Sequence, residues 1–337
     1  MSDYRHELVF GTFLTPQTRR PSDVVALAQR SEYAGLDLVT FQDHPYQPAF
    51  LDTWTLLSYV AARTERVHLS GNVIGLPLRN PAVLARSAAS LDLLSGGRLE
   101  LGIGAGAFWD SIRAMGGPRR RPADAVAAFS EALDIIHAIW DTAAPGGVYA
   151  DGTHYRVHGA KRGPAPAHAI PIWVGALKPK MLRVLAEKAD GWLPSLSYLS
   201  RAELVRSNQI IDESATDAGR DPHDIRRLLN ITGSFDTRDV GFFQGPSKQW
   251  VEQLLPFVVE DGVATFILAT DDSKAIDTWG HEVAPALRDA VAAERTSSPR
   301  RKSHMPVDVA KWDRRSSGST PLVAVQSLQS VLQVRHD

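Results

Sequence analysis

Three alternating glycines follow a short apolar run in the stretch Leu99-Glu-Leu-Gly-Ile-Gly-Ala-Gly106, and Ala107-Phe-Trp-Asp110 continues it. A glycine at the carboxyl end of a strand lets backbone N–H groups approach a ligand closely, because it has no Cβ atom. Where a helix begins nearby, such a turn usually binds an anionic group. The alternative is that Gly104 and Gly106 only allow a helix to pack closely on a strand.

Gly102, Gly104 and Ala107 also match the G-x-G-x-x-[GA] pattern of dinucleotide-binding proteins. That fingerprint belongs to the first strand–helix turn of its fold, with an acidic residue about 20 positions later. Here the glycines follow the fourth predicted strand, and residues 125–130 lie inside a helical pattern. Their place in the chain therefore argues against a dinucleotide fold.

His44 is the candidate general acid or base, because the usual pKa of histidine lies near neutral pH. It follows the apolar run Leu36–Phe41 together with Asp43. In a regular strand these two neighbours point to opposite faces, so Asp43 cannot be assumed to orient His44. The simpler interpretation is a histidine that only forms a hydrogen bond at a strand end before Pro45.

Eight strand–helix units in series position these residues. The predicted strands are mostly continuous apolar runs, which is typical of parallel strands buried on both faces. We therefore predict a (β/α)8 TIM barrel, whose chemistry lies at the carboxyl ends of the strands. The predicted strands are Glu7–Phe13, Leu36–Phe41, Val67–Ile74, Leu99–Ile103, Ile172–Val174, Gly191–Leu193, Leu228–Thr232 and Ala264–Leu268.

Proline, glycine and serine mark the predicted helix ends. Ser22 is expected to cap the first helix, which should end at Gly35, and Pro81 should begin the third. The other helices are predicted at Thr53–Arg63, Pro122–Trp140, from after the fifth strand through Ala189, Arg201–Ala218, Ser247–Glu260 and Lys274–Ala293.

Two segments are expected to lie over the carboxyl-end face of the barrel. Phe108–Arg121 is predicted to be irregular, and Val148–Val157 is predicted to form a hairpin around an Asp-Gly turn. Residues 1–295 are interpreted as one domain, and residues 296–337 as a polar, flexible tail.

The composition narrows the function classes. The 337 residues carry a formal net charge of −1, with 44% hydrophobic and 22% charged residues. We therefore expect neither a nucleic-acid nor a membrane partner. The chain has no cysteine, which excludes disulfides and thiolate metal sites. We expect no metal and a cytoplasmic location.

The segments Leu69–Arg86 and Asp92–Gly106 resemble the luciferase-like monooxygenase superfamily, and the similarity extends over Glu7–Ala292. This superfamily includes bacterial luciferase and oxidoreductases that depend on the deazaflavin F420. The resemblance implies the same barrel and a flavin-class oxidoreductase. Its cofactor would be coenzyme F420 or FMN, with F420 slightly favoured by the pair Asp43-His44.

The resemblance also implies roles for individual residues. The catalytic residues would be His44 and Asp43. In the family, strand three often ends in a cis peptide against the flavin, and here the matching step is Asn72–Val73 or Gly71–Asn72. The residues assigned to the cofactor, including its phosphate, are Asn72, Val73, Gly104, Ala105, Gly106, Asp110, Gly175 and Ala176.

Aromatic residues near the strand ends are candidates for the substrate pocket, although such residues as often belong to the core. These are Tyr46, Phe108, Trp109 and Trp192.

One departure from the family concerns the substrate. The sugar-phosphate dehydrogenases of this group have a glutamate directly after the Gly-x-Gly turn, where this chain has Ala107. A small, more apolar organic substrate is therefore expected. Hydride transfer and O2-dependent monooxygenation both remain open, and so does a non-catalytic flavin-binding partner subunit. Relatives usually dimerise, so a homodimer is expected.

Overall fold

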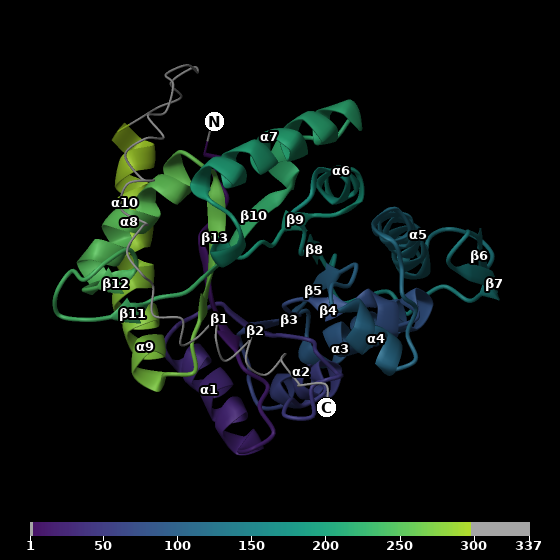
Figure 1. Cartoon of the computed structure of the whole chain (residues 1–337), viewed down its shortest axis with the longest axis horizontal. Helices are drawn as coiled ribbons and strands as arrows, with labels where there is room; N and C mark the ends of the chain where they lie inside the picture. Colours follow the sequence, from purple (N-terminus) through teal and green to yellow (C-terminus); the bar gives the residue numbers. More distant parts are fainter. Residues whose placement is uncertain (1–2, 298–337) are drawn as a thin grey trace. The chain divides into compact units, whose positions relative to one another are not determined.

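Eight parallel strands close into a barrel in the computed structural model, which describes residues 3–297 (Figure 1). Each strand pairs with its neighbours in the chain, β1 pairs with β13, and β3 pairs with β5. This confirms the predicted (β/α)8 barrel. Its strands are β1 (Val9–Leu14), β2 (Leu38–Phe41), β3 (His68–Gly71) with its continuation β4 (Ile74–Gly75), β5 (Leu99–Gly104), β8 (Ile172–Val174), β9 (Gly191–Trp192), β10 (Arg226–Ile231) and β13 (Val263–Ala269).

Helices follow the strands and cover the outside of the barrel. Pro81 begins its helix as predicted, after Asn80, whose side chain accepts hydrogen bonds from two backbone N–H groups. The helices are α1 (Pro21–Tyr33), α2 (Thr53–Ala61), α3 (Pro81–Ser95), α5 (Pro122–Trp140), α6 (Pro179–Lys188), α7 (Arg201–Asp217), α8 (Ser247–Val259), α9 (Ser273–Thr278) and α10 (Ala284–Ser297), with a π-helical turn at Trp279–Val283.

The start of α1 corrects one prediction. The helix begins at Pro21, with Arg20 as its N-cap residue, so Ser22 lies inside the first turn and does not cap it. Proline fits the first helical position because its missing N–H needs no partner there. The other end is as predicted, with Gly35 at a φ of 81° just beyond the helix.

Two layers of side chains make up the core. The larger layer lies between the strands and the helices, and the smaller one fills the lumen of the barrel. Because strand residues alternate in direction, each strand contributes to both layers. The lumen cluster contains Leu38, Trp173, Leu193, Leu228 and Ile267.

The third predicted strand is interrupted. A cis peptide bond joins Asn72 and Val73, as the family resemblance implied, and it separates β3 from β4. Short 3-10 turns follow β4 and β9 and precede β10, at Leu76–Leu78, Leu196–Tyr198 and Pro222–Asp224.

The segments between the strands and helices differ in detail from their predictions. Phe108–Arg121 is not wholly irregular, because it contains the short helix α4 (Trp109–Ala114). The predicted hairpin is present as β6 (Val148–Asp151) and β7 (Arg156–Ala160). Its loop is longer than an Asp-Gly turn, since Asp151 pairs with Arg156. A second small sheet joins β11 (Ser234–Phe235) and β12 (Gln244–Gly245).

No helix among residues 3–297 is long and apolar enough to cross a membrane. Helix α10 continues to Ser297, slightly beyond the predicted end of the last helix. The rest of the predicted C-terminal tail lies outside the described residues.

Candidate active site

His44 lies in the loop after β2, at the carboxyl end of the barrel strands. Its Nδ1 atom shares a hydrogen bond of 2.7 Å with the hydroxyl group of Tyr46. Burial lowers the pKa of His44 below its usual 6.5, although the charge of Asp43 acts in the opposite direction. At pH 7 the imidazole is therefore neutral and can accept or donate a proton.

Tyr46 determines which nitrogen of His44 remains available. Burial raises the pKa of Tyr46, so its hydroxyl group stays protonated at neutral pH. If this hydroxyl donates to Nδ1, the neutral imidazole carries its proton on Nε2. If Nδ1–H donates instead, Nε2 is an acceptor. In both cases Nδ1 is occupied, and Nε2 is the atom left for a ligand.

Aromatic rings surround this imidazole. The ring of Phe108 lies 5.3 Å from that of His44, edge to face, and 6.0 Å from that of Tyr46, measured between ring centroids. Phe50 lies 6.4 Å from His44. The structure therefore brings the predicted residues Tyr46 and Phe108 together with His44. Their apolar surfaces limit the access of water to the imidazole.

Asp43 points away from His44. Its carboxylate accepts hydrogen bonds from the backbone N–H of Gly75, at 2.8 Å, and from the guanidinium group of Arg79, at 2.9 Å. The Asp43 side chain is only 1% exposed. The structure therefore does not bring the two predicted catalytic side chains together. Asp43 instead anchors the end of β2 to β4, and it acts on His44 only through its charge.

A polar cluster that the sequence analysis missed crosses the mouth of the barrel. The side-chain amides of Asn72 and Asn230 form two hydrogen bonds with each other, at 2.7 and 3.0 Å. Asn72 also donates to Thr40 Oγ1, and Asn230 donates to Ser195 Oγ. Asn230 is 6% exposed. Its signal in the sequence is an amide residue within the apolar run Leu228–Ile231.

Val73, next to Asn72, packs against two of the predicted glycines. A Cβ atom on Gly104 would lie 2.6 Å from a methyl carbon of Val73, and one on Gly175 would lie 3.1 Å from it. The N–H group of Gly175 donates to Ile103 O at 3.2 Å. Both glycines therefore serve close packing at the mouth of the barrel, and the N–H of Gly175 is already used.

The loop after β5 offers a row of backbone donors. Within residues 3–297, the N–H groups of residues 105–108 have no acceptor. Gly106 has a φ of 95°, and a Cβ atom there would lie 2.6 Å from Pro77. Glycine is thus required for the path of this loop.

A second row of donors lies in the loop after β8, a strand that pairs directly with β5. The N–H groups of Ala176, Leu177 and Lys178 have no acceptor among the described residues, and Lys178 adds a positive charge just before α6. Successive free N–H groups near a helix start form a site for a phosphate group. The donors present therefore fit the phosphate of a flavin or deazaflavin.

The Trp109 ring lies near the site loop, because a Cβ atom on Gly106 would lie 3.2 Å from it, but Asp110 and Trp192 have other surroundings. Trp109 begins α4, and Asp110 is exposed and forms an ion pair with Arg119. Trp192 is only 1% exposed and belongs to the layer outside the barrel, where its indole N–H donates to Ala176 O at 2.8 Å. The structure therefore does not bring Trp192 to the site.

No group of three or more histidine, aspartate or glutamate side chains among residues 3–297 is arranged to hold a metal ion.

Comparisons with known proteins identify the family and the fold. A model of the luciferase-like monooxygenase family matches residues 8–239. A phthiodiolone/phenolphthiodiolone dimycocerosates ketoreductase of Mycobacterium sp. (strain JLS) is 36% identical over 208 residues, which cover 58% of this chain and 51% of the relative. An F420-dependent glucose-6-phosphate dehydrogenase of Nocardia farcinica (strain IFM 10152) is 31% identical over 228 residues, covering 64% and 66%.

The chain thus matches about half of the length of the first relative and just under two thirds of the second. Among solved structures, an F420-dependent secondary alcohol dehydrogenase in complex with an F420-acetone adduct has a TM-score of 0.74 at 20% sequence identity. That match covers 84% of this chain and 100% of the other, and it supports the shared fold.

Proposed function

The chain belongs to the luciferase-like monooxygenase family, and on that basis we propose that it is an oxidoreductase that uses a reduced flavin or deazaflavin. The observation that carries this proposal is a juxtaposition at one end of the barrel. There the half-buried, neutral His44 lies beside Phe108. Phe108 belongs to the loop of residues 105–108, whose free N–H groups suit a phosphate. Such a site combines a place for the cofactor with a group that transfers protons.

Coenzyme F420 is the cofactor that we favour over FMN. Three relatives carry names that include F420 dependence, and the chain has the Asp43-His44 pair after β2. When bound, the cofactor would supply the hydride or the activation of oxygen, which protein side chains cannot provide.

The protein would contribute binding and proton transfer. The N–H groups of residues 105–108 and 176–178 would hold the phosphate, while Val73 would support the ring system. Nε2 of His44 would donate a proton to the substrate during reduction or accept one during oxidation, with Tyr46 fixing the imidazole through Nδ1. Phe108 and Tyr46 would keep water from the reacting groups.

The substrate would be a small organic molecule with apolar surface. Ala107 stands where the sugar-phosphate dehydrogenases of the family have an acidic residue, and Phe108 follows it. A ketone, an alcohol or an aromatic compound fits these surroundings better than a sugar phosphate.

We also propose that the protein forms a homodimer. Helices α2 and α3 present exposed apolar side chains, and a shallow groove between them is lined in part by Trp54 and Leu91. Clusters of this kind often mark protein interfaces. The exposed residues of this surface are Tyr59, Val83, Leu93 and Leu94. The cytoplasmic location is a separate proposal, which rests on the composition.

Turnover assays test the enzymatic proposal. Reduced F420 would be mixed with a panel of ketones and aromatic acceptors, and reduced FMN would be tested with the same panel and oxygen. We expect cofactor oxidation that depends on the acceptor, with His44→Ala slowing it about 100-fold or more. Cofactor binding without turnover on any acceptor would favour a non-catalytic partner subunit, and unchanged turnover in His44→Ala would remove His44 from the mechanism.

A further inference from the structure

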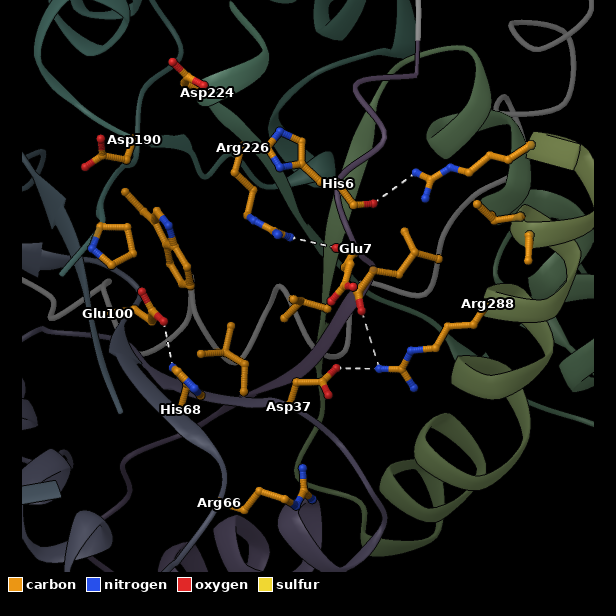
Figure 2. A pocket seen from close by; sticks show the side chains of 18 residues that line it. His6, Glu7, Asp37, Arg66, His68, Glu100, Asp190, Asp224, Arg226 and Arg288 are labelled. Atoms are coloured by element: carbon orange, nitrogen blue, oxygen red, sulfur yellow. Dashed lines mark hydrogen bonds and ion pairs between the residues drawn. The ribbon is translucent and has the colours of Figure 1, made fainter. Parts of the chain in front are cut away.

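A cavity opens at the end of the barrel opposite the candidate active site, where the strands begin (Figure 2). Its volume is about 900 Å³, which is within the range of small-molecule sites. In barrels of this class the amino ends of the strands usually serve stability rather than catalysis. This cavity is lined by ionisable groups, and it has no part in the proposed oxidoreductase site.

Three ionisable side chains start the inward-facing rows of their strands. His68 is the first residue of β3, Glu100 is the second residue of β5, and Arg226 is the first residue of β10. Leu38 and Trp173 of the lumen cluster also line the cavity and give it apolar surface. The barrel therefore places charges of both signs around one apolar surface.

Glu100 has one oxygen atom without a partner. Its Oε1 atom shares a hydrogen bond of 2.7 Å with Nδ1 of His68, as Figure 2 shows. Its Oε2 atom is fully buried and has no hydrogen-bond partner among the described residues, and Glu100 as a whole is 8% exposed. A buried carboxylate oxygen without a donor is costly, so this atom is suited to a hydrogen-bond donor from a ligand.

Arg226, in contrast to Glu100, has hydrogen-bond donors without an acceptor. One terminal nitrogen of its guanidinium group donates to Glu7 O at 3.1 Å and to Thr265 Oγ1 at 2.9 Å. The other two nitrogens have no acceptor among the described residues. Figure 2 shows this side chain reaching toward Glu7 at the cavity. Two adjacent N–H donors of a guanidinium group match the two oxygens of a carboxylate.

The remaining charges do not favour a ligand of a single sign. Asp37 pairs with Arg288 at 2.7 Å, and Arg295 pairs with Asp3 at 2.6 Å, so both pairs are balanced. The other charged lining residues include both acids and a base: Glu7, Asp190, Asp224 and Arg66.

We propose that this cavity binds a small zwitterion of the α-amino acid class. Its ammonium group would donate to Oε2 of Glu100, its carboxylate would accept from Arg226, and an aliphatic side chain would rest on Leu38 and Trp173. An amine alone would leave the Arg226 donors unpaired, and a carboxylate alone would leave Glu100 unpaired. The site is independent of the oxidoreductase proposal.

Isothermal titration calorimetry on the full chain tests this proposal with three probes: L-alanine, ethylamine and propanoate, at equal pH and ionic strength. We expect L-alanine to bind saturably at millimolar or lower concentration. Each fragment should bind at least about tenfold more weakly, because each lacks one charged hydrogen-bonding group. Glu100→Gln keeps the shape of the side chain and should weaken L-alanine binding to a similar degree.

A matched control and a second variant complete the test. Glu252→Gln, on the exposed face of α8, should bind L-alanine like the unmodified protein. Arg226→Lys keeps the positive charge but loses the two adjacent N–H donors, so it should also weaken L-alanine binding. Circular dichroism would establish that each variant is folded. Absence of L-alanine binding, equal binding of either fragment, or full binding by folded Glu100→Gln would overturn the proposal.

Discussion

At the scale of single residues, the candidate chemistry depends on the hydrogen bond between His44 and Tyr46. That bond occupies Nδ1 and leaves Nε2 available, while the ring of Phe108 covers part of the imidazole. Asp43, adjacent in sequence, is bound to Gly75 and Arg79. The proposed proton transfer therefore belongs to His44 alone.

Tyr46→Phe removes the hydroxyl group and keeps the ring. We expect kcat to fall about tenfold or more, with a smaller change in KM, because the imidazole loses its fixed orientation.

In the oxidation direction His44 must be neutral to accept a proton. Because burial lowers its pKa, activity should persist above pH 6.5 and decline only below it. A pH profile of kcat, recorded for the unmodified protein and for Tyr46→Phe, tests both expectations. An unchanged kcat in Tyr46→Phe would contradict the role of Tyr46.

Residue types and position along the chain predicted His44, Tyr46 and Phe108 as candidate site residues, and the structure brings their rings together. Trp192 was not assigned correctly from sequence, because it and Leu193 lie on opposite sides of the same strand. Which of the two faces the lumen depends on the strand's register. Asn230 was missed because its partner, Asn72, is 158 positions away and meets it only when the barrel closes.

At the scale of elements, the Asn72–Asn230 pair joins β10 to the end of β3 across the lumen. Replacing Asn230 by Ala leaves the half-buried Asn72 amide partly unpaired. We expect the free energy of unfolding to fall by about 1–3 kcal/mol, as measured by urea denaturation. Thr232→Ala is the control, because Thr232 is exposed and lies just beyond β10. It should change the free energy of unfolding by less than about 0.5 kcal/mol. Equal stability of the two variants would disprove a structural role for the pair.

One side chain of α5, Glu131, holds the loop of the β6–β7 hairpin. The Glu131 carboxylate accepts hydrogen bonds from the backbone N–H groups of Thr153, His154 and Tyr155, at 3.0, 2.9 and 3.0 Å. Burial raises the pKa of Glu131, but these donors outweigh it and the pKa is lowered overall. The carboxylate is thus charged at neutral pH.

Glu131→Ala should therefore release this loop. We expect hydrogen exchange at residues 153–155 to accelerate about tenfold, while exchange in the barrel strands stays the same. Glu213→Ala, an exposed glutamate on α7, is the control. Unchanged exchange at these residues in Glu131→Ala would show that the strands alone hold the hairpin.

Element boundaries were predictable where the local chemistry decides them. Asn80 and Pro81 start α3 by capping and by the fixed φ of proline, and Pro122–Trp140 has a strong helical period. The predictions failed where longer-range contacts decide. The hairpin loop is shaped by Glu131, from another element, and α4 is too short for its period to be recognised.

At the scale of the whole molecule, the serial strand–helix pattern was enough to predict a closed barrel, because parallel strands need helical crossovers. The sequence pattern did not reveal the cavity at the amino ends of the strands. Its ionisable residues come from separate strands and are brought together only by closure of the barrel.

The proposed dimer predicts a specific disruption. Leu94 is 86% exposed on the α2–α3 surface, so Leu94→Glu should convert a dimer to a monomer in analytical ultracentrifugation, because a buried charge is costly. Val240→Glu, at another exposed apolar residue, should remain dimeric. A monomeric unmodified protein, or a dimeric Leu94→Glu variant, would contradict this interface.

An equilibrium titration with F420 and FMN, each in oxidised and reduced form, tests the proposed cofactor site directly. We expect binding, with F420 preferred. Gly106→Ala should weaken cofactor binding at least about tenfold. The added Cβ atom would collide with Pro77 and displace the loop of residues 105–108, whose N–H groups would hold the phosphate. Gly116→Ala, at a glycine that also has positive φ but open space around it, should bind like the unmodified protein. If neither cofactor binds, or if Gly106→Ala binds the cofactor as tightly as the unmodified protein does, the proposed cofactor site is wrong.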